Sequence, residues 1–155
     1  MKDLIGKVVK EMYVNQDQSL LKFETDQGSF IYEAVGDCCS ETWFADIIFG
    51  FKFFNGTKVQ EVTDLDIPEW LSGYFNKDGR TRQEYDEVYG YRIKTESSRD
   101  YRWASDSVVC DVIFRNSSNG YYGGWCELIT DVECKWNKKK LEEAEWTEIK
   151  EDWQA

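Results

Sequence analysis

The sequence contains no histidine and only one proline in its 155 residues. Histidine is the usual general base near neutral pH and a common metal ligand, so its absence argues against histidine-dependent catalysis and histidine-ligated metal. With a single proline, long irregular linkers are not expected. The first residues do not form a signal peptide, and no apolar run approaches the roughly 20 residues of a membrane span, so no membrane association is expected.

Positive charge is also scarce. The chain has 19 basic and 30 acidic residues, a formal net charge of −11. A chain with this field is repelled by phosphate backbones, so direct nucleic-acid binding is not expected. The acidic excess is spread along the chain, because residues 1–50 alone hold nine acids and four bases. This distribution suits solubility, and it also suits docking on a basic protein surface.

Aromatic residues, in contrast, are abundant, with 7 Trp, 9 Tyr and 9 Phe. A chain of this length buries roughly two thirds of its unfolded surface, which is enough for a core without disulfides. The five cysteines are an odd number, and reduced thiols in a cytosol are the expected state. We therefore predict one domain over residues 1–155, with a β-rich core over 1–135.

Period-2 alternation predicts most of the secondary structure. Leu20 to Asp26 alternates as a half-buried strand does, and the turn residues Asp26-Gln27-Gly28 lead into renewed alternation to Ala34, which predicts a β-hairpin. The apolar run Val108–Arg115 predicts a central strand. A second hairpin is predicted at Asn119-Gly120, between that run and a last strand over Tyr121–Val132. Further strands are expected at Lys7–Val14, Lys58–Thr63 and Tyr89–Glu96.

Two segments have helical spacing instead. In Ser40–Gly50, Trp43 and Ile47 share one helical face, Ser40 suits an N-cap and Gly50 a C-terminal cap, which predicts a short buried helix. In residues 138–155, Trp146, Ile149 and Trp153 predict an amphipathic C-terminal helix. The expected fold class is therefore α+β: a mainly antiparallel twisted sheet covered by one short internal helix and a C-terminal helix.

The vicinal cysteines Cys38 and Cys39 are the first candidate site. Zinc needs four ligands, and neither histidine nor a Cys-x-x-Cys pair is present. A nucleophilic thiolate needs a base or a positive environment, whereas Asp37 and Glu41 flank these thiols. We therefore expect both cysteines to pack at the edge of the core as the chain enters the short helix. No catalytic residue, metal or cofactor is predicted, and the chain is not expected to be an enzyme.

The second candidate is a partner-binding surface. Carboxylates spaced along a rigid surface can imitate phosphates, and neighbouring aromatic residues can provide a desolvated anchor. An acidic and aromatic loop has this composition, and a glycine-rich turn adds a tyrosine pair. The predicted contacts are Glu61, Asp64, Asp66, Glu69, Trp70 and Tyr74, with Tyr121 and Tyr122 as a second patch. A solvated loop whose aromatic side chains fold back into the core is the alternative.

Two segments resemble an uncharacterised family of small phage and prophage proteins. Gly36 to Ile47 is similar to that family's Asp-Cys-Cys…Asp-Ile stretch, and Arg115 to Gly124 is similar to its Ser-Asn-Gly-Tyr-Tyr hairpin. The opening Leu4–Lys7 is similar as well. Many members have a histidine just before Asp-Cys-Cys, where this chain has Ala34-Val35-Gly36. The resemblance implies an accessory protein of a mobile element in a bacterial cytoplasm, and no established activity.

Together these features suggest a non-enzymatic inhibitor of a basic, nucleic-acid-handling host defence protein, such as a CRISPR effector, that acts as a nucleic-acid mimic. One alternative is a small-molecule or nucleotide-binding module or enzyme, with an aromatic pocket between the Tyr121-Tyr122 hairpin and Asp37-Cys38. The other alternative is a structural or assembly protein. The sequence leaves the partner and the oligomeric state open.

Overall fold

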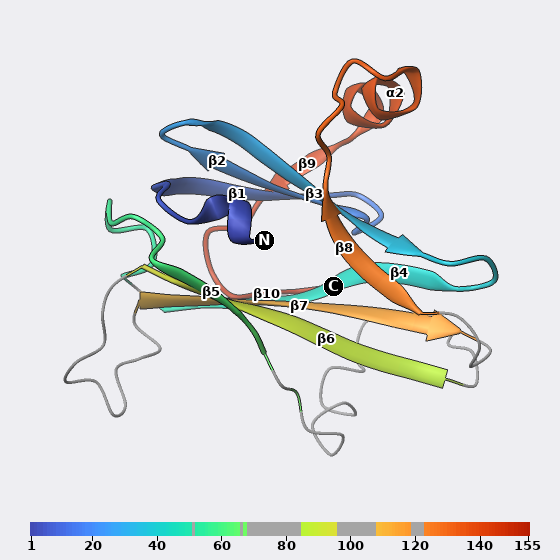
Figure 1. The fold of residues 1–155 in the computed structure, drawn as a ribbon, viewed down its shortest axis with the longest axis horizontal. Coiled ribbons are helices and arrows are strands. Elements are labelled where there is room, and N and C mark those ends of the chain that lie inside the picture. Colours follow the sequence, from blue (N-terminus) through green and yellow to red (C-terminus); the bar gives the residue numbers. More distant parts are fainter. Residues whose placement is uncertain (51, 66, 68–84, 96–107, 119–122) are drawn as a thin grey trace.

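The computed structural model describes residues 1–50, 52–65, 67, 85–95, 108–118 and 123–155. In these residues the chain forms two five-stranded antiparallel sheets, which lie one above the other as two layers (Figure 1). The described fold is therefore mostly β, and the expected α+β class with two covering helices is wrong. No helix in the described part of the chain is long and apolar enough to cross a membrane.

The first sheet, sheet I, is built mainly from the N-terminal part of the chain. It follows a short 3-10 helix η1 (Lys2–Leu4), and its strand order is β8-β3-β2-β1-β9. The strands are β1 (Val9–Asn15), β2 (Leu20–Thr25), β3 (Gly28–Gly36), β8 (Gly124–Leu128) and β9 (Trp146–Glu148).

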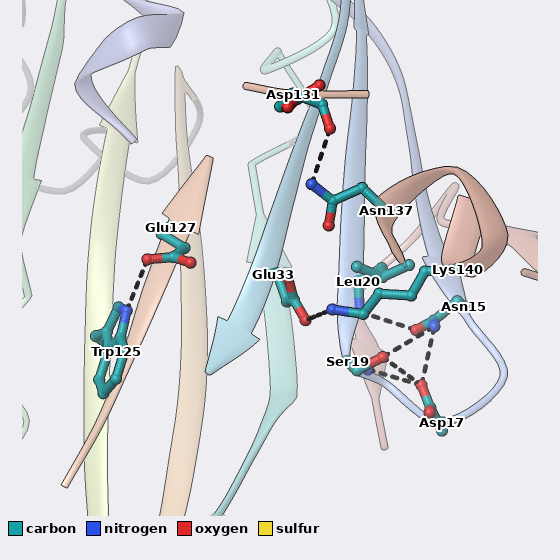
Figure 2. A network of polar contacts seen from close by, with 10 residues as sticks. All are labelled: Asn15, Asp17, Ser19, Leu20, Glu33, Trp125, Glu127, Asp131, Asn137 and Lys140. Carbon is teal, nitrogen blue, oxygen red and sulfur yellow. Dashed lines mark hydrogen bonds and ion pairs between the residues drawn. The ribbon is translucent and has the colours of Figure 1, made fainter. Parts of the chain in front are cut away.

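The predicted hairpin between β2 and β3 is confirmed. Thr25 pairs with Gly28 across the turn, and Gly28 has a φ of 109°, a conformation that glycine adopts without strain. The preceding turn, between β1 and β2, is closed by side chains: Asn15 Nδ2 and Ser19 Oγ both donate to Asp17 Oδ1, at 2.8 and 2.6 Å (Figure 2). Local turn chemistry therefore fixes the start of sheet I.

The second sheet, sheet II, has the order β10-β4-β7-β6-β5. Its strands are β4 (Glu41–Phe49), β5 (Glu61–Asp64), β6 (Tyr85–Lys94), β7 (Val109–Ser118) and β10 (Trp153–Gln154). The expected central position of the Val108–Arg115 run is confirmed, because β7 is the middle strand and nine of its ten residues are buried. Apolar residues on both faces are typical of a strand covered on both sides.

The segment Ser40–Gly50 is a strand, so the predicted internal helix is wrong. Residues 41–49 form β4, which pairs with β7 along its length with one irregularity between Phe44 and Asp46. Six consecutive residues of β4, from Thr42 to Ile47, are buried. When both faces of a strand are buried the period-2 signal disappears, and the remaining apolar run fits a helix by chance.

The predicted C-terminal helix over residues 138–155 is also wrong. A helix α2 (Lys135–Glu143) occurs there, but none of its residues is buried and Trp136 is 72% exposed. Trp146 and Trp153, expected on one helical stripe, instead lie in β9 and β10, which pair with β1 and β4. The chain from 144 onward therefore extends across the edges of both sheets.

Helix α2 lies outside the two layers and is tied to sheet I by polar contacts (Figure 1, Figure 2). Asn137 Nδ2 donates to the backbone oxygen of Asp131 at 2.8 Å, and Lys140 Nζ donates to Glu33 at 2.5 Å. Its first turn has no acidic residue, so the helix dipole is not compensated there. These polar ties, rather than an apolar face, position α2.

The predicted hairpin between the Val108–Arg115 run and the last strand is wrong as well. Strand β8 pairs with β3 of sheet I, with Gly36 opposite Gly124, whereas β7 belongs to sheet II. The chain therefore changes sheets between β7 and β8. A turn-rich sequence between two strands is compatible with either connection, because it does not determine which neighbour each strand pairs with.

The apolar core lies between the two sheets. Phe23 and Tyr32 from sheet I meet edge to face with ring centroids 5.8 Å apart, and Phe44 and Phe114 from sheet II meet at 6.4 Å. All four side chains are at most 3% exposed. Burial of large apolar side chains, at roughly 1.5–3 kcal/mol each, is the main force that holds the layers together.

Candidate functional site

A cavity of about 480 Å³ opens beside the edge strands β5 of sheet II and β8 of sheet I. Its walls come from β6 and β7 as well as from Asp64, Leu65 and Ile67 at the end of β5. This volume lies within the range of roughly 300–1,000 Å³ that is usual for ligand sites. The cavity is therefore the first candidate for a binding site in the described part of the chain.

One wall of the cavity is aromatic. Phe114 of β7 stacks with Tyr89 at 5.2 Å between ring centroids and with Tyr91 at 5.8 Å, and both tyrosines belong to β6. Tyr89 lies directly opposite Phe114 in the pairing of the two strands. Trp125 of β8 also lines the cavity and is 40% exposed. Partly exposed tyrosine and tryptophan side chains of this kind commonly anchor a bound partner.

The polar side-chain groups of the described lining are the Asp64 carboxylate, the hydroxyls of Tyr89 and Tyr91 and the indole N–H of Trp125, and two of them bond to carboxylates outside the lining. Tyr89 Oη donates to Glu87, and Trp125 Nε1 donates to Glu127 Oε2 at 2.9 Å (Figure 2). Burial, followed by the hydrogen bond to Glu87, raises the pKa of Tyr89 above its ordinary value, and burial raises that of Tyr91. Both hydroxyls therefore remain protonated at neutral pH; that of Tyr89 donates its proton to Glu87 and keeps its oxygen lone pairs as acceptors.

Among the described residues that line the cavity, none is basic, and Asp64 is acidic. An aromatic wall with a carboxylate attracts cations through the ring faces and through direct charge. The same wall offers no counter-charge to a phosphate. The described lining is therefore suited to a cationic or neutral group and unsuited to an anionic one.

The predicted partner-binding residues divide into two groups. Glu61 and Asp64 are exposed residues of β5, at the edge of sheet II. Because successive side chains of a strand alternate, Asp64 shares the face of the buried Val62, toward the cavity, and Glu61 points the other way, opposite Lys94. The other predicted contacts lie outside the described residues: Asp66, Glu69, Trp70, Tyr74, Tyr121 and Tyr122.

Of the predicted contacts in the described residues, Asp64 lines the cavity, whereas no residue of the aromatic wall was among the predicted contacts. The alternation of Tyr89, Tyr91 and Ile93 predicted a strand with these side chains on one face, but not that this face borders a cavity. Phe114 had no distinguishing signal, because it lies within a continuous apolar run. Trp125 was the more informative residue for locating the cavity, because it is a large side chain at the start of an edge strand.

The connection between β3 and β4 adjoins one end of this region. The Asp37 amide donates to the Gly123 carbonyl at 3.1 Å, and Ser40 Oγ donates to the Asp37 carbonyl at 2.8 Å. Cys38 and Cys39, between these residues, are exposed, so the expectation that they pack at the core edge is wrong. No helix follows them, and the tight turn leaves both side chains at the surface.

Next to this connection the two sheets are in close contact. A Cβ atom on Gly124 would lie 2.2 Å from Thr42 Oγ1 and 2.6 Å from Asn116 Nδ2, and these two groups are themselves hydrogen-bonded at 2.8 Å. Only glycine fits at a contact of this kind. The contact holds β8 against sheet II and so fixes one side of the cavity.

No group of three or more cysteine or acidic side chains within the described ranges is arranged to hold a metal ion. The cysteines are also separated in the fold: Cys110 is buried in β7, Cys126 lies in β8 and Cys134 precedes α2. Burial raises the pKa of Cys126 from its ordinary 9.0 to about 12. This thiol is therefore protonated at neutral pH, and a protonated thiol is a poor nucleophile and a poor ligand.

Residues 2–128 match a protein family described as a domain of unknown function, DUF7448. The chain belongs to the DUF7448 family. An uncharacterised protein of Acanthamoeba polyphaga mimivirus is 31% identical to this DUF7448 protein over 140 residues, which cover 83% of this chain and 88% of the viral protein. No solved structure matches it. The expectation of an uncharacterised family is confirmed, and α2, β9 and β10 lie beyond the part that matches DUF7448.

Proposed function

We propose that this DUF7448 protein is a non-enzymatic binding protein that docks on a basic protein. The observation that supports the proposal is the aromatic cavity, which has Asp64 at its rim and no basic residue among its described lining. The net charge of −11 favours the same class of partner, because a negative field accelerates encounters with a positive surface. The viral relative favours an accessory role in a virus or another mobile element.

In this proposal a lysine or arginine side chain of the partner enters the cavity. Its charged group meets the faces of Tyr89 and Trp125, and the carboxylate of Asp64 neutralises it. A cation on an aromatic face contributes roughly 0.5–2 kcal/mol, and more when water is excluded. A partner that normally holds nucleic acid in a basic groove would be inhibited, because the acidic protein would occupy that groove.

Affinity capture tests this function. The protein, immobilised at low ionic strength, is exposed to bacterial and Acanthamoeba lysates, and bound proteins are eluted with rising salt. We expect a basic, nucleic-acid-handling protein that elutes only at high salt, because screening weakens contacts between exposed charges. Capture that does not change with salt would contradict an electrostatic docking surface.

Matched substitutions locate the contact. Trp125→Ala and Asp64→Lys are each expected to weaken binding by on the order of tenfold, since an anchoring side chain contributes roughly 1–2 kcal/mol. Trp136→Ala and Glu142→Lys make the same chemical changes on α2, outside the cavity, and are expected to leave binding unchanged. Equal effects of the two pairs would place the contact elsewhere.

A small-molecule site is the second candidate, and the volume of the cavity favours it. The described lining suits a neutral or cationic aromatic compound better than a nucleotide, whose phosphates Asp64 repels. A thermal-shift screen of the purified protein distinguishes the two functions, because a ligand of the folded state raises the melting temperature by an amount that grows with the ratio of its concentration to its dissociation constant. A hit that Trp125→Ala abolishes, with no protein captured from either lysate, would favour the small-molecule function.

A further inference from the structure

Two thiols lie next to each other on the surface of the connection between β3 and β4. The Sγ atoms of Cys38 and Cys39 are 3.4 Å apart, and both residues are exposed. Cys39 has a φ of +65°, so the backbone turns sharply at this point. The ends of the turn are fixed, because the Ser40 amide donates to the Asp37 carbonyl at 3.0 Å and the Asp37 amide donates to Gly123.

The other three cysteines are less accessible. Cys110 is buried, and Cys126 and Cys134 are half-buried. Burial raises the pKa of Cys110 well above its ordinary value, as it does that of Cys126. The hydrogen bond to Cys39 also raises the pKa of Cys38, so accessibility separates the two groups of thiols: reaction with a dissolved reagent is expected first at Cys38 and Cys39 because their sulfurs are exposed.

We propose that Cys38 and Cys39 are a redox-active dithiol, which a low-molecular-weight disulfide such as glutathione disulfide oxidises to a vicinal disulfide. One thiolate attacks the reagent, breaks its S–S bond and releases one reagent thiol. The neighbouring thiolate then attacks the mixed disulfide, forms the Cys38–Cys39 bond and releases the second reagent thiol. Two electrons pass to the reagent, and the two cysteine protons appear on the two thiols released.

The geometry favours the second step. With 3.4 Å between the sulfurs, the neighbouring thiol is already within reach of the mixed disulfide, so ring closure competes well with further adduct formation. The α-carbons of adjacent residues are about 3.8 Å apart across a trans peptide, whereas ordinary disulfides span about 4.4–6.8 Å. The ring is therefore strained, and strained disulfides are easily reduced, which makes the reaction reversible.

Oxidation of the dithiol is expected to alter the cavity, because the turn that holds both cysteines contacts the strand that forms one cavity wall. The turn is hydrogen-bonded to Gly123, the residue before β8, and Gly124 and Trp125 of that strand line the cavity. A ring closed at Cys38–Cys39 changes the backbone between Asp37 and Ser40, the residues that make these contacts. The dithiol itself does not depend on the proposed binding function.

Mass spectrometry of one peptide tests the proposal. Residues 23–52 form a single tryptic peptide, because no lysine or arginine occurs between Lys22 and Lys52, and it contains Cys38 and Cys39 but no other cysteine. The full-length protein is incubated with glutathione disulfide, quenched with acid, alkylated and digested. We expect this peptide to lose two hydrogens and to resist alkylation. Excess reduced glutathione is expected to restore two alkylatable thiols.

Variants distinguish ring closure from simple modification. Cys38→Ser and Cys39→Ser are each expected to accumulate a stable glutathione adduct on the remaining cysteine, because no second thiol displaces it. Cys134→Ser, which removes a cysteine outside the turn, is expected to close the ring like the unchanged protein. The proposal is overturned if the unchanged protein keeps both thiols, carries glutathione on them, or forms a disulfide between two chains.

Discussion

At the scale of single residues, the contact around Gly124 holds the two sheets together beside the cavity. Gly124→Ala places a methyl group against Thr42 Oγ1 and Asn116 Nδ2, so we expect the free energy of unfolding to fall by about 2 kcal/mol. Gly123→Ala is the matched control, because among the described residues its methyl group would meet only Tyr89 Oη, at 3.9 Å. Urea denaturation measures both, and equal losses would contradict the close contact.

A buried ion pair on the other face of sheet II gives a second prediction. The Arg115 side chain is 1% exposed, and its guanidinium donates to Asp86 through Nε, at 3.2 Å, and through Nη2. Asp86→Ala leaves a buried charge without this carboxylate, and we expect a loss of about 3 kcal/mol of stability. Asp111→Ala breaks a similar pair with Arg92, but this arginine is 39% exposed. The expected loss there is about 1 kcal/mol, and urea midpoints that rank the two variants the other way would contradict this account.

Residue-scale features were the hardest part of the site to predict. Asp64 was proposed as a contact because an excess of acid on one segment is visible in the sequence, and the structure places it at the cavity. The stacking of Tyr89 on Phe114 depends on the pairing of two strands, and a single sequence does not specify this register. The exposure of Cys38 and Cys39 was missed for a related reason, since it follows from a sharp turn that leads into strand β4 and not into the expected helix.

At the scale of elements, alternation predicted strands with one solvent face, whereas of the two strands covered on both faces β7 was predicted and β4 was not. The hairpin of β2 and β3 was confirmed, because alternation and a short turn together determine the pairing. Strand β4 was mistaken for a helix because burial on both faces removes the alternation. The C-terminal helix was predicted wrongly for a different reason. The spacing of Trp146 and Trp153 fits a helix, but each tryptophan lies in a short strand that extends a different sheet.

The C-terminal segment, residues 144–155, acts as a strap across both sheets. Strand β9 covers the edge of β1, β10 covers the edge of β4, and Ile149 between them is 3% exposed and donates its amide to Met12 at 2.8 Å.

Ile149→Ala is expected to cost about 3 kcal/mol of stability, from lost burial and the cavity left behind. Trp136→Ala, on the exposed face of α2, is expected to cost little. Urea denaturation compares them, and a negligible effect of Ile149→Ala would show that the strap does not share the core.

At the scale of the whole molecule, the high strand content was predicted, but the α+β class and the arrangement of the strands were wrong. Many aromatic residues and period-2 patterns indicated a β-rich protein with a real core, as observed. The division into two sheets was not visible, because it depends on where the chain crosses between them. Two crossings, from β3 to β4 and from β7 to β8, meet at the hydrogen bond between Asp37 and Gly123. Turn residues do not distinguish such crossings from hairpins.

The titratable groups of the whole molecule predict how its stability depends on pH. No histidine is present, so no side chain with an ordinary pKa changes charge between about pH 6 and 8. Burial lowers the pKa of the Met1 amino group below its ordinary 8.0, so stability is expected to rise slightly as the pH approaches 8. Burial raises the pKa of Tyr32 above its ordinary 10.0, and that of Cys126 from 9.0 to about 12. Above pH 9 the unfolded chain therefore releases protons that the folded protein retains.

This difference in bound protons fixes the sign of the pH dependence. A state that binds fewer protons gains stability as pH rises, so the free energy of unfolding falls progressively above pH 9 and continues to fall toward pH 12. Urea midpoints measured at each pH, with excess reductant to keep the thiols free, test this. Tyr32→Phe is expected to make the decline shallower, because it removes one of the retained protons. A decline that begins below pH 8, or a variant that declines as steeply as the unchanged protein, would mean that these buried groups do not control the alkaline transition.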